Sequence, residues 1–454
     1  MGTATTLHFA SLFTPDGWCR DARVTVADGL VSALAMDTPP QPEDERHAVG
    51  FPGMPNLHSH AFQRGMAGLA EHREQGEDSF WTWREAMYRF VHALDPDTFE
   101  AIAALAYMEM LEAGFTRVGE FHYLHNAPDG GSYDNPARMA GALAAAAAST
   151  GQALTMLPVF YAQGGFGGIT AGAQQRRFVT DPESYGRLLE GARAALAGLD
   201  DARLGIAPHS LRAVTPASLR EVLALAPAGP VHIHIAEQER EVADCRDWSG
   251  ARPVQWLMDN ADVGADWCLV HATHVDRSEL AAIARSKAVV GLCPITEANL
   301  GDGMFPAVEA LGQGVRFGIG SDSNVRIDMT EELRLLEYGQ RLIHRRRNCL
   351  AGSEGGSTGR VLFERALAGG QQALAAPSPL GLGSPADIVS LNADHPSLIG
   401  RSGDALLDGL MFAAGQGAID CVWRRGIKWV EGGRHRNRDA IRARYRMTLE
   451  GLLA

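Results

Sequence analysis

The sequence contains almost no lysine. Of its 41 basic residues, only Lys287 and Lys428 are lysines, and the rest are arginines. Acidic residues outnumber the basic ones and give a net charge of −13. Because such a charge repels nucleic acids and anionic membranes on average, we expect neither as a partner. An anionic substrate would need local arginines to bind.

Paired cysteines and long apolar runs are also missing. The 6 cysteines form no C-x-x-C pair, and Cys268 and Cys293 lie inside apolar runs, so we expect reduced and buried thiols. No apolar run approaches the roughly 18 residues that span a bilayer, and the N-terminus lacks the basic region of a secretory signal. The sequence therefore predicts a cytoplasmic protein, neither secreted nor embedded in a membrane.

From residue 51 onward, short apolar runs rich in Val, Ile and Leu alternate with stretches of helical spacing. Helices are expected at 95–114, 181–199 and 215–227, where Asp-Pro or Thr-Pro supplies the cap and the first residue. This alternation predicts an α/β fold, a (β/α)₈ barrel of the TIM type. An open doubly wound sheet is the alternative, but no G-x-G-x-x-G or phosphate loop follows any run. The eight runs are 51–60, 115–123, 153–161, 202–210, 229–237, 267–274, 288–294 and 315–323.

The two ends of the chain have a different pattern. Residues 1–50 and 380–435 contain strands of period two, separated by Asp-Gly and glycine-rich turns. We expect both segments to pair into one small β-sandwich domain. The barrel is then expected over 51–379 and a C-terminal helix over 436–454.

Polar residues close several of the eight runs. In a barrel of this type the active site lies at the carboxyl ends of the strands, so these residues should meet. His58 and His60 end the first run, and both imidazoles point to the same side because strand side chains alternate. Several imidazoles with one carboxylate form a ligand set that suits zinc and leaves a position for water. The corresponding residues of later runs are His234, His271 and Asp322.

Glu237 follows His234 by three residues and is expected near the metal without being needed as a ligand. A divalent metal lowers the pKa of its water to about 7, and a neighbouring carboxylate can carry protons. A single histidine at a strand end, such as His209, is more often structural than a ligand, and His232 is expected in the core. An activated serine is the other hydrolytic option, but no G-x-S-x-G elbow follows the runs.

These residues resemble the amidohydrolase superfamily, whose members carry H-x-H after the first barrel strand, histidines after the fifth and sixth, and an aspartate after the eighth. Members with two metals usually bridge them with a lysine from the fourth strand. Here the fourth run ends in "IAPHS", and Lys287 and Lys428 lie elsewhere, so the resemblance implies one metal. The "HIAE" of 234–237 resembles the H-x-x-E of the deaminase branch.

Five segments narrow the resemblance to the formimidoylglutamate deiminase family: "HSHAFQRGMAG", "SFWTWREAMYRF", "GEFHYLH", "LCPITEANLGDGMFP" and "SDSNVRIDMTEELRLLEYGQRL". That family hydrolyses N-formimidoyl-L-glutamate to N-formyl-L-glutamate and ammonia in histidine degradation. The resemblance implies one divalent metal ion per chain, with Zn²⁺ expected. It also implies a small anionic molecule as the substrate.

The resemblance also assigns roles to individual residues. Glu237 would carry protons, His271 would polarise the attacking water, and Asp322 would accept a hydrogen bond from that water. The residues implied to hold the metal are His58, His60, His234 and Asp322. The residues implied to bind the substrate are Gln63, Arg84, Tyr123, His209 and Arg212.

Two other functions stay open. One is another deaminase of the same branch acting on a ring such as guanine or cytosine, whose pocket would want aromatic stacking and amide donors rather than two arginines. The other is a metal-binding barrel without catalysis, which would have no need of Glu237. Chains of this size are commonly dimers, so a homodimer is expected.

Overall fold

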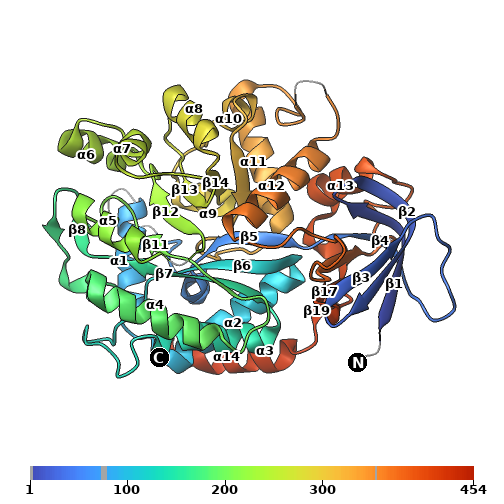
Figure 1. Ribbon diagram of the computed structural model, residues 1–454, viewed down its shortest axis with the longest axis horizontal. Coiled ribbons are helices and arrows are strands. Elements are labelled where there is room, and N and C mark those ends of the chain that lie inside the picture. Colours follow the sequence, from blue (N-terminus) through green and yellow to red (C-terminus); the bar gives the residue numbers. More distant parts are fainter. Residues whose placement is uncertain (1–3, 73–78, 227, 353–354) are drawn as a thin grey trace.

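The computed structural model describes residues 4–72, 79–226, 228–352 and 355–454. Two parts lie side by side in Figure 1. A strand-and-helix barrel occupies the left of the view, and a sheet built from both ends of the chain occupies the right.

The barrel strands follow the eight predicted runs. Neighbouring strands are parallel, in the orders β10-β7-β6-β5 and β12-β13-β14-β15, with β11 also paired to β7. Bridges between Ser59 and Asp322 and between Ser210 and His234 join the two sheets into a closed barrel. The predicted α/β barrel is therefore confirmed. Its strands are β5 (Met54–Ser59), β6 (Phe115–His122), β7 (Ala153–Phe160), β10 (Arg203–Leu204), β11 (Ala207–Pro208), β12 (Val231–Ile235), β13 (Trp267–His271), β14 (Val289–Leu292) and β15 (Arg316–Ile319).

The fourth barrel strand differs from the continuous run predicted at 202–210. It is split into β10 and β11, with Gly205 between them. A Cβ at Gly205 would lie 2.3 Å from the carbonyl oxygen of Pro230, so only glycine fits this close approach. The chain still carries His209 to the carboxyl end of the barrel.

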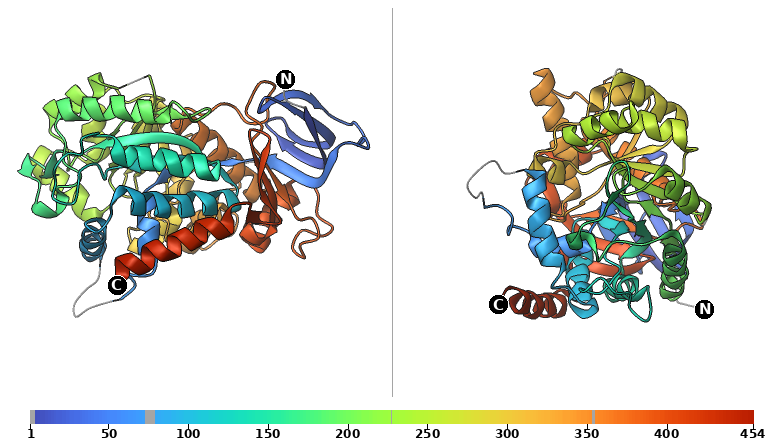
Figure 2. Two further views of the ribbon diagram at one scale, coloured as in Figure 1. Left: turned by 90° about the horizontal axis from the view of Figure 1, so that it is seen from below. Right: turned by 90° about the vertical axis from the view of Figure 1, so that its left-hand side faces the viewer.

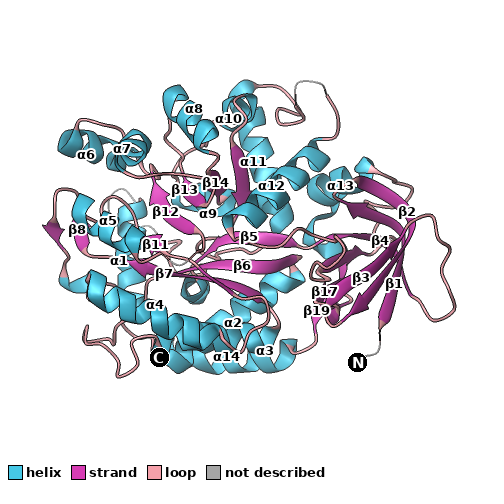
Figure 3. Ribbon diagram, viewed as in Figure 1, coloured by secondary structure: helices cyan, strands magenta, loops and turns pink. Residues whose placement is uncertain are grey.

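Helices surround the barrel strands (Figure 3). The three predicted helices begin after their expected caps, as at Asp95, whose side chain accepts a hydrogen bond of 2.8 Å from Thr98 N. The helix predicted at 215–227 ends at Ala224, and residue 227 lies outside the described part of the chain. The helices around the barrel are η1 (Ala61–Met66), α1 (Phe80–Val91), α2 (Pro96–Glu112), α3 (Arg138–Thr150), α4 (Pro182–Leu196), α5 (Pro216–Ala224), α6 (Glu239–Ser249), α7 (Pro253–Asn260), α8 (Arg277–Ser286), α9 (Pro294–Leu300), α10 (Ala307–Gly312), α11 (Met329–His344) and α12 (Thr358–Ala373).

Smaller elements complete the chain outside the barrel strands. Between β7 and α4 lie a short hairpin, β8 (Gln163–Gly165) and β9 (Ile169–Thr170), and the turn η2 (Ala173–Gln175). Before β17 lie α13 (Asp404–Gly409), η3 (Leu410–Ala414) and η4 (Gly415–Ala418). The last helix, α14 (Arg438–Leu453), returns along α2 on the outside of the barrel (Figure 2).

Both ends of the chain build one eight-stranded sheet in the order β19-β18-β17-β16-β4-β1-β2-β3. Phe9 in β1 and Trp423 in β17 have two strands, β16 and β4, between them in this order, yet their ring centroids lie 6.3 Å apart. The sheet must therefore curl over a shared core, as expected for a sandwich-like domain. The boundaries at residues 50, 380 and 436 stay predictions. The strands are β1 (Thr5–Thr14), β2 (Gly17–Ala27), β3 (Leu30–Ala35), β4 (Glu45–Pro52), β16 (Ile388–Leu391), β17 (Ile419–Arg424), β18 (Ile427–Glu431) and β19 (Arg434–His435).

The helices and the cysteines bear on the expected absence of a membrane span and on the expected burial of the thiols. Over the described residues, no helix combines the length and the apolar character that crossing a membrane requires. Every cysteine is free, but Cys19 and Cys349 are only partly buried, which corrects the expectation that all the thiols are buried. Cys19 lies on the partly exposed strand β2, and Cys349 lies in the loop after α11.

Candidate metal and catalytic site

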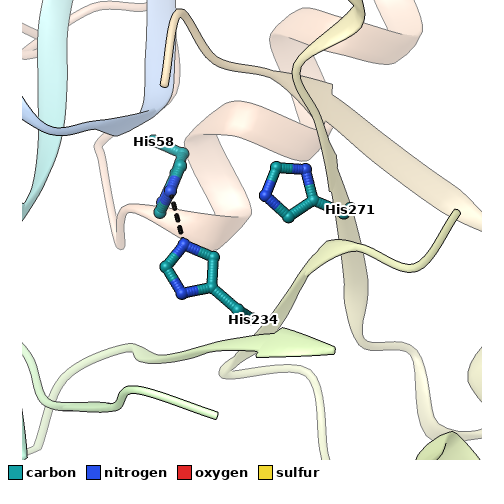
Figure 4. A group of neighbouring side chains, drawn as sticks. All are labelled: His58, His234 and His271. Atoms are coloured by element: carbon teal, nitrogen blue, oxygen red, sulfur yellow. Dashed lines mark hydrogen bonds between the residues drawn. The ribbon is translucent and has the colours of Figure 1, made fainter. Parts of the chain in front are cut away.

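Four predicted metal ligands meet at the carboxyl end of the barrel strands. The Nε2 atoms of His58 in β5 and His234 in β12 lie 3.0 Å apart. Asp322, which follows β15, places Oδ1 3.5 Å from His58 Nε2 and 3.2 Å from His60 Nε2. Figure 4 shows the rings of His58 and His234 directed toward each other, with His271 beside them. The structure therefore brings together the whole predicted ligand set.

The chemistry of this donor set fits a divalent cation. His60 Nδ1 and His234 Nδ1 lie 2.9 and 3.1 Å from the carbonyl oxygens of Phe121 and His209. Because a carbonyl can only accept, each Nδ1 carries the proton, and each Nε2 lone pair points into the cluster. Burial lowers the pKa of His58 to about 3 and also lowers the pKa values of His60 and His234, so the rings are neutral. Neutral imidazoles with converging lone pairs are the form that binds zinc.

The backbone at these strand ends is left-handed without glycine. The φ angles are +51° at Ala236, +68° at His271 and +42° at Asp322. Each such angle costs roughly 1 kcal/mol or more, and neighbouring hydrogen bonds hold it in place. One of them runs from Asp322 N to the carbonyl oxygen of His58, at 2.9 Å. Strain of this kind concentrates at functional sites because it fixes the direction of a side chain.

His271 lies beside His58 and His234 and also contacts three carboxylates. Its Nε2 is 3.8 Å from Glu237 Oε1 and 3.7 Å from Asp322 Oδ2, and its Nδ1 is 3.2 Å from Glu297 Oε1. Burial alone would lower the pKa of His271, but these carboxylates outweigh burial and raise it to about 10. Burial raises the pKa of Glu237, which suits a group that must both take and return a proton.

A cavity of about 730 Å³ opens over these residues. Glu237, His271 and Asp322 line it, so the proton-carrying groups and the metal donors face one space. Gln63 Nε2 donates a 2.9 Å hydrogen bond to the hydroxyl of Tyr123 in its wall. The five residues predicted to bind substrate also line it: Gln63, Arg84, Tyr123, His209 and Arg212.

Two guanidinium groups, those of Arg84 and Arg212, line this cavity, and over the residues described each has an N–H group without a hydrogen-bond acceptor. Arg212 Nη2 lies 3.6 Å from Glu237 Oε2, and Arg84 in α1 stacks on the ring of Trp81, with Cζ 4.6 Å from the ring centroid. Within the described part of the chain, the Nε–H groups of both arginines are buried and donate no hydrogen bond. A buried donor without a partner is costly, so both groups are suited to bind an anion.

The amidohydrolase family model matches residues 49–428 of this chain. The chain belongs to the amidohydrolase family. A second model, the N-terminal domain of formimidoylglutamate deiminase HutF, matches residues 5–48. The two matches together span nearly the whole of this amidohydrolase.

Relatives and solved structures agree with this assignment. The chain is 51% identical over 427 residues to the formimidoylglutamate deiminase of Pseudomonas aeruginosa, covering 93% of each chain. It is 28% identical to the 5-methylthioadenosine/S-adenosylhomocysteine deaminase of Halobacterium salinarum, covering 85% of this chain and 83% of the relative.

The crystal structure of an amidohydrolase from Brucella melitensis is 53% identical, with a TM-score of 0.96 over 99% of this chain and 100% of that one. An adenosine deaminase from Xanthomonas campestris with bound zinc, 21% identical with a TM-score of 0.82 over 99% and 98% of the two chains, shares the fold.

Sequence reasoning assigned no role to several residues of this amidohydrolase that contact the site. Glu297 Oε1 accepts a 2.9 Å hydrogen bond from Cys293 N and also contacts the ring of His271, and Glu241 lies beneath Glu237. Glu241 lies in the first turn of α6, where an acidic residue is common, so its position gave no signal. The aromatic residues around the cavity gave no signal either, since tryptophan and tyrosine are common in ordinary cores.

Ser357 and His232 lie outside the cluster of metal donors. A G-x-S-x-G spacing occurs at 355–359, away from the strand-like runs. Its serine, Ser357, caps α12, accepting a 2.9 Å hydrogen bond from Arg360 N, and contacts Asp408 at 2.9 Å. Ser357 does not line the cavity, so it offers no nucleophile there. His232 is buried in the core as expected, with Nε2 2.7 Å from the carbonyl oxygen of Ala373.

Proposed function

We propose that this amidohydrolase hydrolyses N-formimidoyl-L-glutamate to N-formyl-L-glutamate and ammonia, as a step of histidine degradation. The relative that is 51% identical carries the name of this activity, and the first 44 matched residues belong to the corresponding N-terminal domain. Two structural features support the proposal independently of the names. They are the metal donors and the paired guanidinium groups.

The observation that carries the proposal is that Arg84 and Arg212 line the same cavity as Glu237 and the metal donors. In a protein with a net charge of −13, two such cations over one cavity favour a substrate with two carboxylates. N-formimidoyl-L-glutamate has two carboxylates, one for each guanidinium group, and a formimidoyl carbon that water can attack. Guanine and cytosine have no carboxylate and would leave both guanidinium groups without a substrate anion.

The cofactor in this proposal is one divalent metal ion per chain, with zinc as the expected ion. His58, His60, His234 and Asp322 would hold it, because their donor atoms converge and the imidazoles are neutral. A divalent ion at this position lowers the pKa of a water molecule to about 7 and so supplies hydroxide at neutral pH. The zinc-bound adenosine deaminase that shares the fold agrees with this choice of metal.

The residues of the chain would move the protons. Glu237 takes one proton from the attacking water and delivers it to the formimidoyl nitrogen, which leaves as ammonia. His271 donates a hydrogen bond to the attacking oxygen, and Asp322 accepts a hydrogen bond from it. Water adds to the formimidoyl carbon, and the hydroxyl of the resulting intermediate gives up the second proton of the water to the terminal nitrogen as the bond from the carbon to that nitrogen breaks. Both protons of the water then lie on ammonia, and a formyl group remains.

The substrate carboxylates would bind at the two arginines. Arg212 approaches Glu237 most closely, so we assign to it the carboxylate nearer the reacting carbon. Arg84, in α1, would take the distal carboxylate together with Tyr123 and Gln63. His209, whose ring centroid lies 5.0 Å from that of His234, would contact the substrate between them. These assignments, a homodimer and a cytoplasmic location are predictions.

An ammonia-release assay tests the proposal. Purified protein should release ammonia from N-formimidoyl-L-glutamate and none from guanine, cytosine or adenosine. Faster turnover of a ring substrate would favour the cyclic-substrate deaminase. Absence of turnover on every substrate, with the metal bound, would favour a barrel without catalysis.

A further inference from the structure

Glu241, in the first turn of α6, is fully buried directly beneath the proton carrier. Its Oε1 accepts a 3.2 Å hydrogen bond from Ala236 N, and its Oε2 accepts a 3.1 Å hydrogen bond from Glu237 N. Ala236 is one of the left-handed positions, with φ of +51°. The carboxylate of Glu241 therefore fixes the strained turn that sets the direction of the Glu237 side chain.

The same carboxylate faces the substrate-binding arginine. Glu241 Oε2 lies 3.8 Å from Arg212 Nη2, and that Nη2 lies 3.6 Å from Glu237 Oε2. The side chains of Glu237 and Glu241 are 7% and 0% exposed, and that of Arg212 is 13% exposed, so water screens these charges little. One oxygen atom of Glu241 thus contacts both the backbone of the proton carrier and the guanidinium group.

We infer that Glu241 is a positioning residue that couples recognition of the substrate carboxylate by Arg212 to proton transfer by Glu237. This inference rests on the proposed function. When a substrate carboxylate binds Arg212, the guanidinium group contacts both the substrate and Glu241. The contact with Glu241 holds the guanidinium group in place while the substrate binds. Glu241 also holds the turn at Ala236 and Glu237. The positions of the substrate carboxylate and of the Glu237 side chain therefore both depend on Glu241.

A comparison within α6 separates this role from ordinary helix stabilisation. Glu239 and Glu241 are both acidic residues of the first helical turn, where the helix dipole favours negative charge. Glu239 is exposed, whereas Glu241 is buried against the turn and Arg212. Glu239→Gln is therefore a matched control, because it removes the same charge from the same helix turn without touching the site.

The test compares Glu241→Gln with Glu239→Gln and the parent protein, using metal content, thermal stability, and kcat and KM for N-formimidoyl-L-glutamate. Glu241→Gln should lower kcat about 10-fold or more and raise KM about 10-fold or more, with metal content unchanged. Glu239→Gln should match the parent in both constants. A change in Tm for Glu241→Gln without a change in kcat or KM would show a purely structural role and overturn the inference.

A double-mutant cycle with Arg212→Met tests the coupling itself. In the Arg212→Met background, Glu241→Gln should still lower kcat but should no longer raise KM, because the guanidinium group is already gone. Fully additive effects on KM would refute the coupling. If Glu241→Gln does not fold, Glu241→Asp replaces it. The retained charge should keep the KM of Glu241→Asp within about 3-fold of that of the parent. The shorter side chain should lower kcat about 10-fold. Parent-like kcat in Glu241→Asp would likewise refute the inference.

The same measurements separate this inference from the proposed function. A parent protein that releases no ammonia from N-formimidoyl-L-glutamate refutes the proposed function. An active parent with a Glu241→Gln variant of equal kcat and KM refutes only the role of Glu241.

Discussion

The Nε2 atoms of His58 and His234 lie 3.0 Å apart, although 176 positions separate the two residues in the chain. The Nδ1 proton of His234 is held by a backbone carbonyl, so its Nε2 presents a lone pair to the other ring. The fold brings these two donors together at strand ends on opposite sides of a closed barrel. Converging lone pairs on two buried rings suit a cation between them, which is the basis of the proposed metal site.

Metal content is the first prediction. Protein purified without chelators should contain one divalent metal ion per chain, most readily zinc. Removal of the ion with a chelator should abolish turnover and lower the Tm, since binding to the native state stabilises it. Asp322→Ala should lower both metal content and turnover. Elemental analysis decides the matter: two ions per chain, or none after mild purification, would contradict a single-metal site.

Substitution of the proton carrier separates chemistry from metal binding. Glu237→Gln keeps the size of the side chain but cannot take up a proton, so kcat should fall by about 100-fold or more. Metal content should stay near one ion per chain. A fully active variant would show that another group carries the proton, and a variant without metal would make Glu237 a ligand.

The pH dependence of turnover should respond to Arg212. Burial raises the pKa of Glu237, and the positive charge of Arg212 lowers it. Arg212→Met removes that charge, so the pKa of Glu237 should rise further. Because Glu237 takes up a proton only as a carboxylate, the acid limb of the kcat profile should move to higher pH. Arg240→Met, which removes an exposed cation from the cavity rim, is the control and should leave the limb in place. A limb that is unchanged or lower in Arg212→Met would contradict this electrostatic account.

Orientation of His271 should depend on Glu297. Glu297 Oε1 lies 3.2 Å from His271 Nδ1 and is itself held by Cys293 N at 2.9 Å. Glu297→Gln weakens this interaction and should lower kcat by roughly 10- to 100-fold, with metal content and KM near those of the parent. Steady-state kinetics and elemental analysis of the variant test this. Equal kcat values would mean that the ring of His271 is positioned without Glu297.

Much of the fold and the cluster was predictable because both follow local rules. The alternation of apolar runs with capped helices predicted the barrel, and parallel strands place their carboxyl ends together. His58 and His60 share a face because strand side chains alternate, so their convergence needed no structural information. The ligands from distant strands then followed from the topology alone.

Other features depended on contacts between segments and left little trace in the sequence. The break in the fourth strand reflects the close approach of Gly205 to Pro230, which no periodicity reports. Glu241 and Glu297 look like ordinary helical acids, and only the packing of α6 and α9 against the strand ends reveals their partners. The curl of the terminal sheet depends on contact between Phe9 and Trp423, which are far apart in the chain.

The most direct test of the proposed function is ammonia release from N-formimidoyl-L-glutamate and from formimidoylglycine, measured for the parent protein and for Arg84→Met and Arg212→Met. The account predicts fast release from formimidoylglutamate and far slower release from formimidoylglycine, which lacks the side-chain carboxylate. Each arginine variant should lose about 100-fold or more in kcat/KM with its metal retained, because it lacks one charge-assisted contact. Equal rates on the two substrates, arginine variants that behave like the parent, or faster release from guanine, cytosine or adenosine would contradict the account.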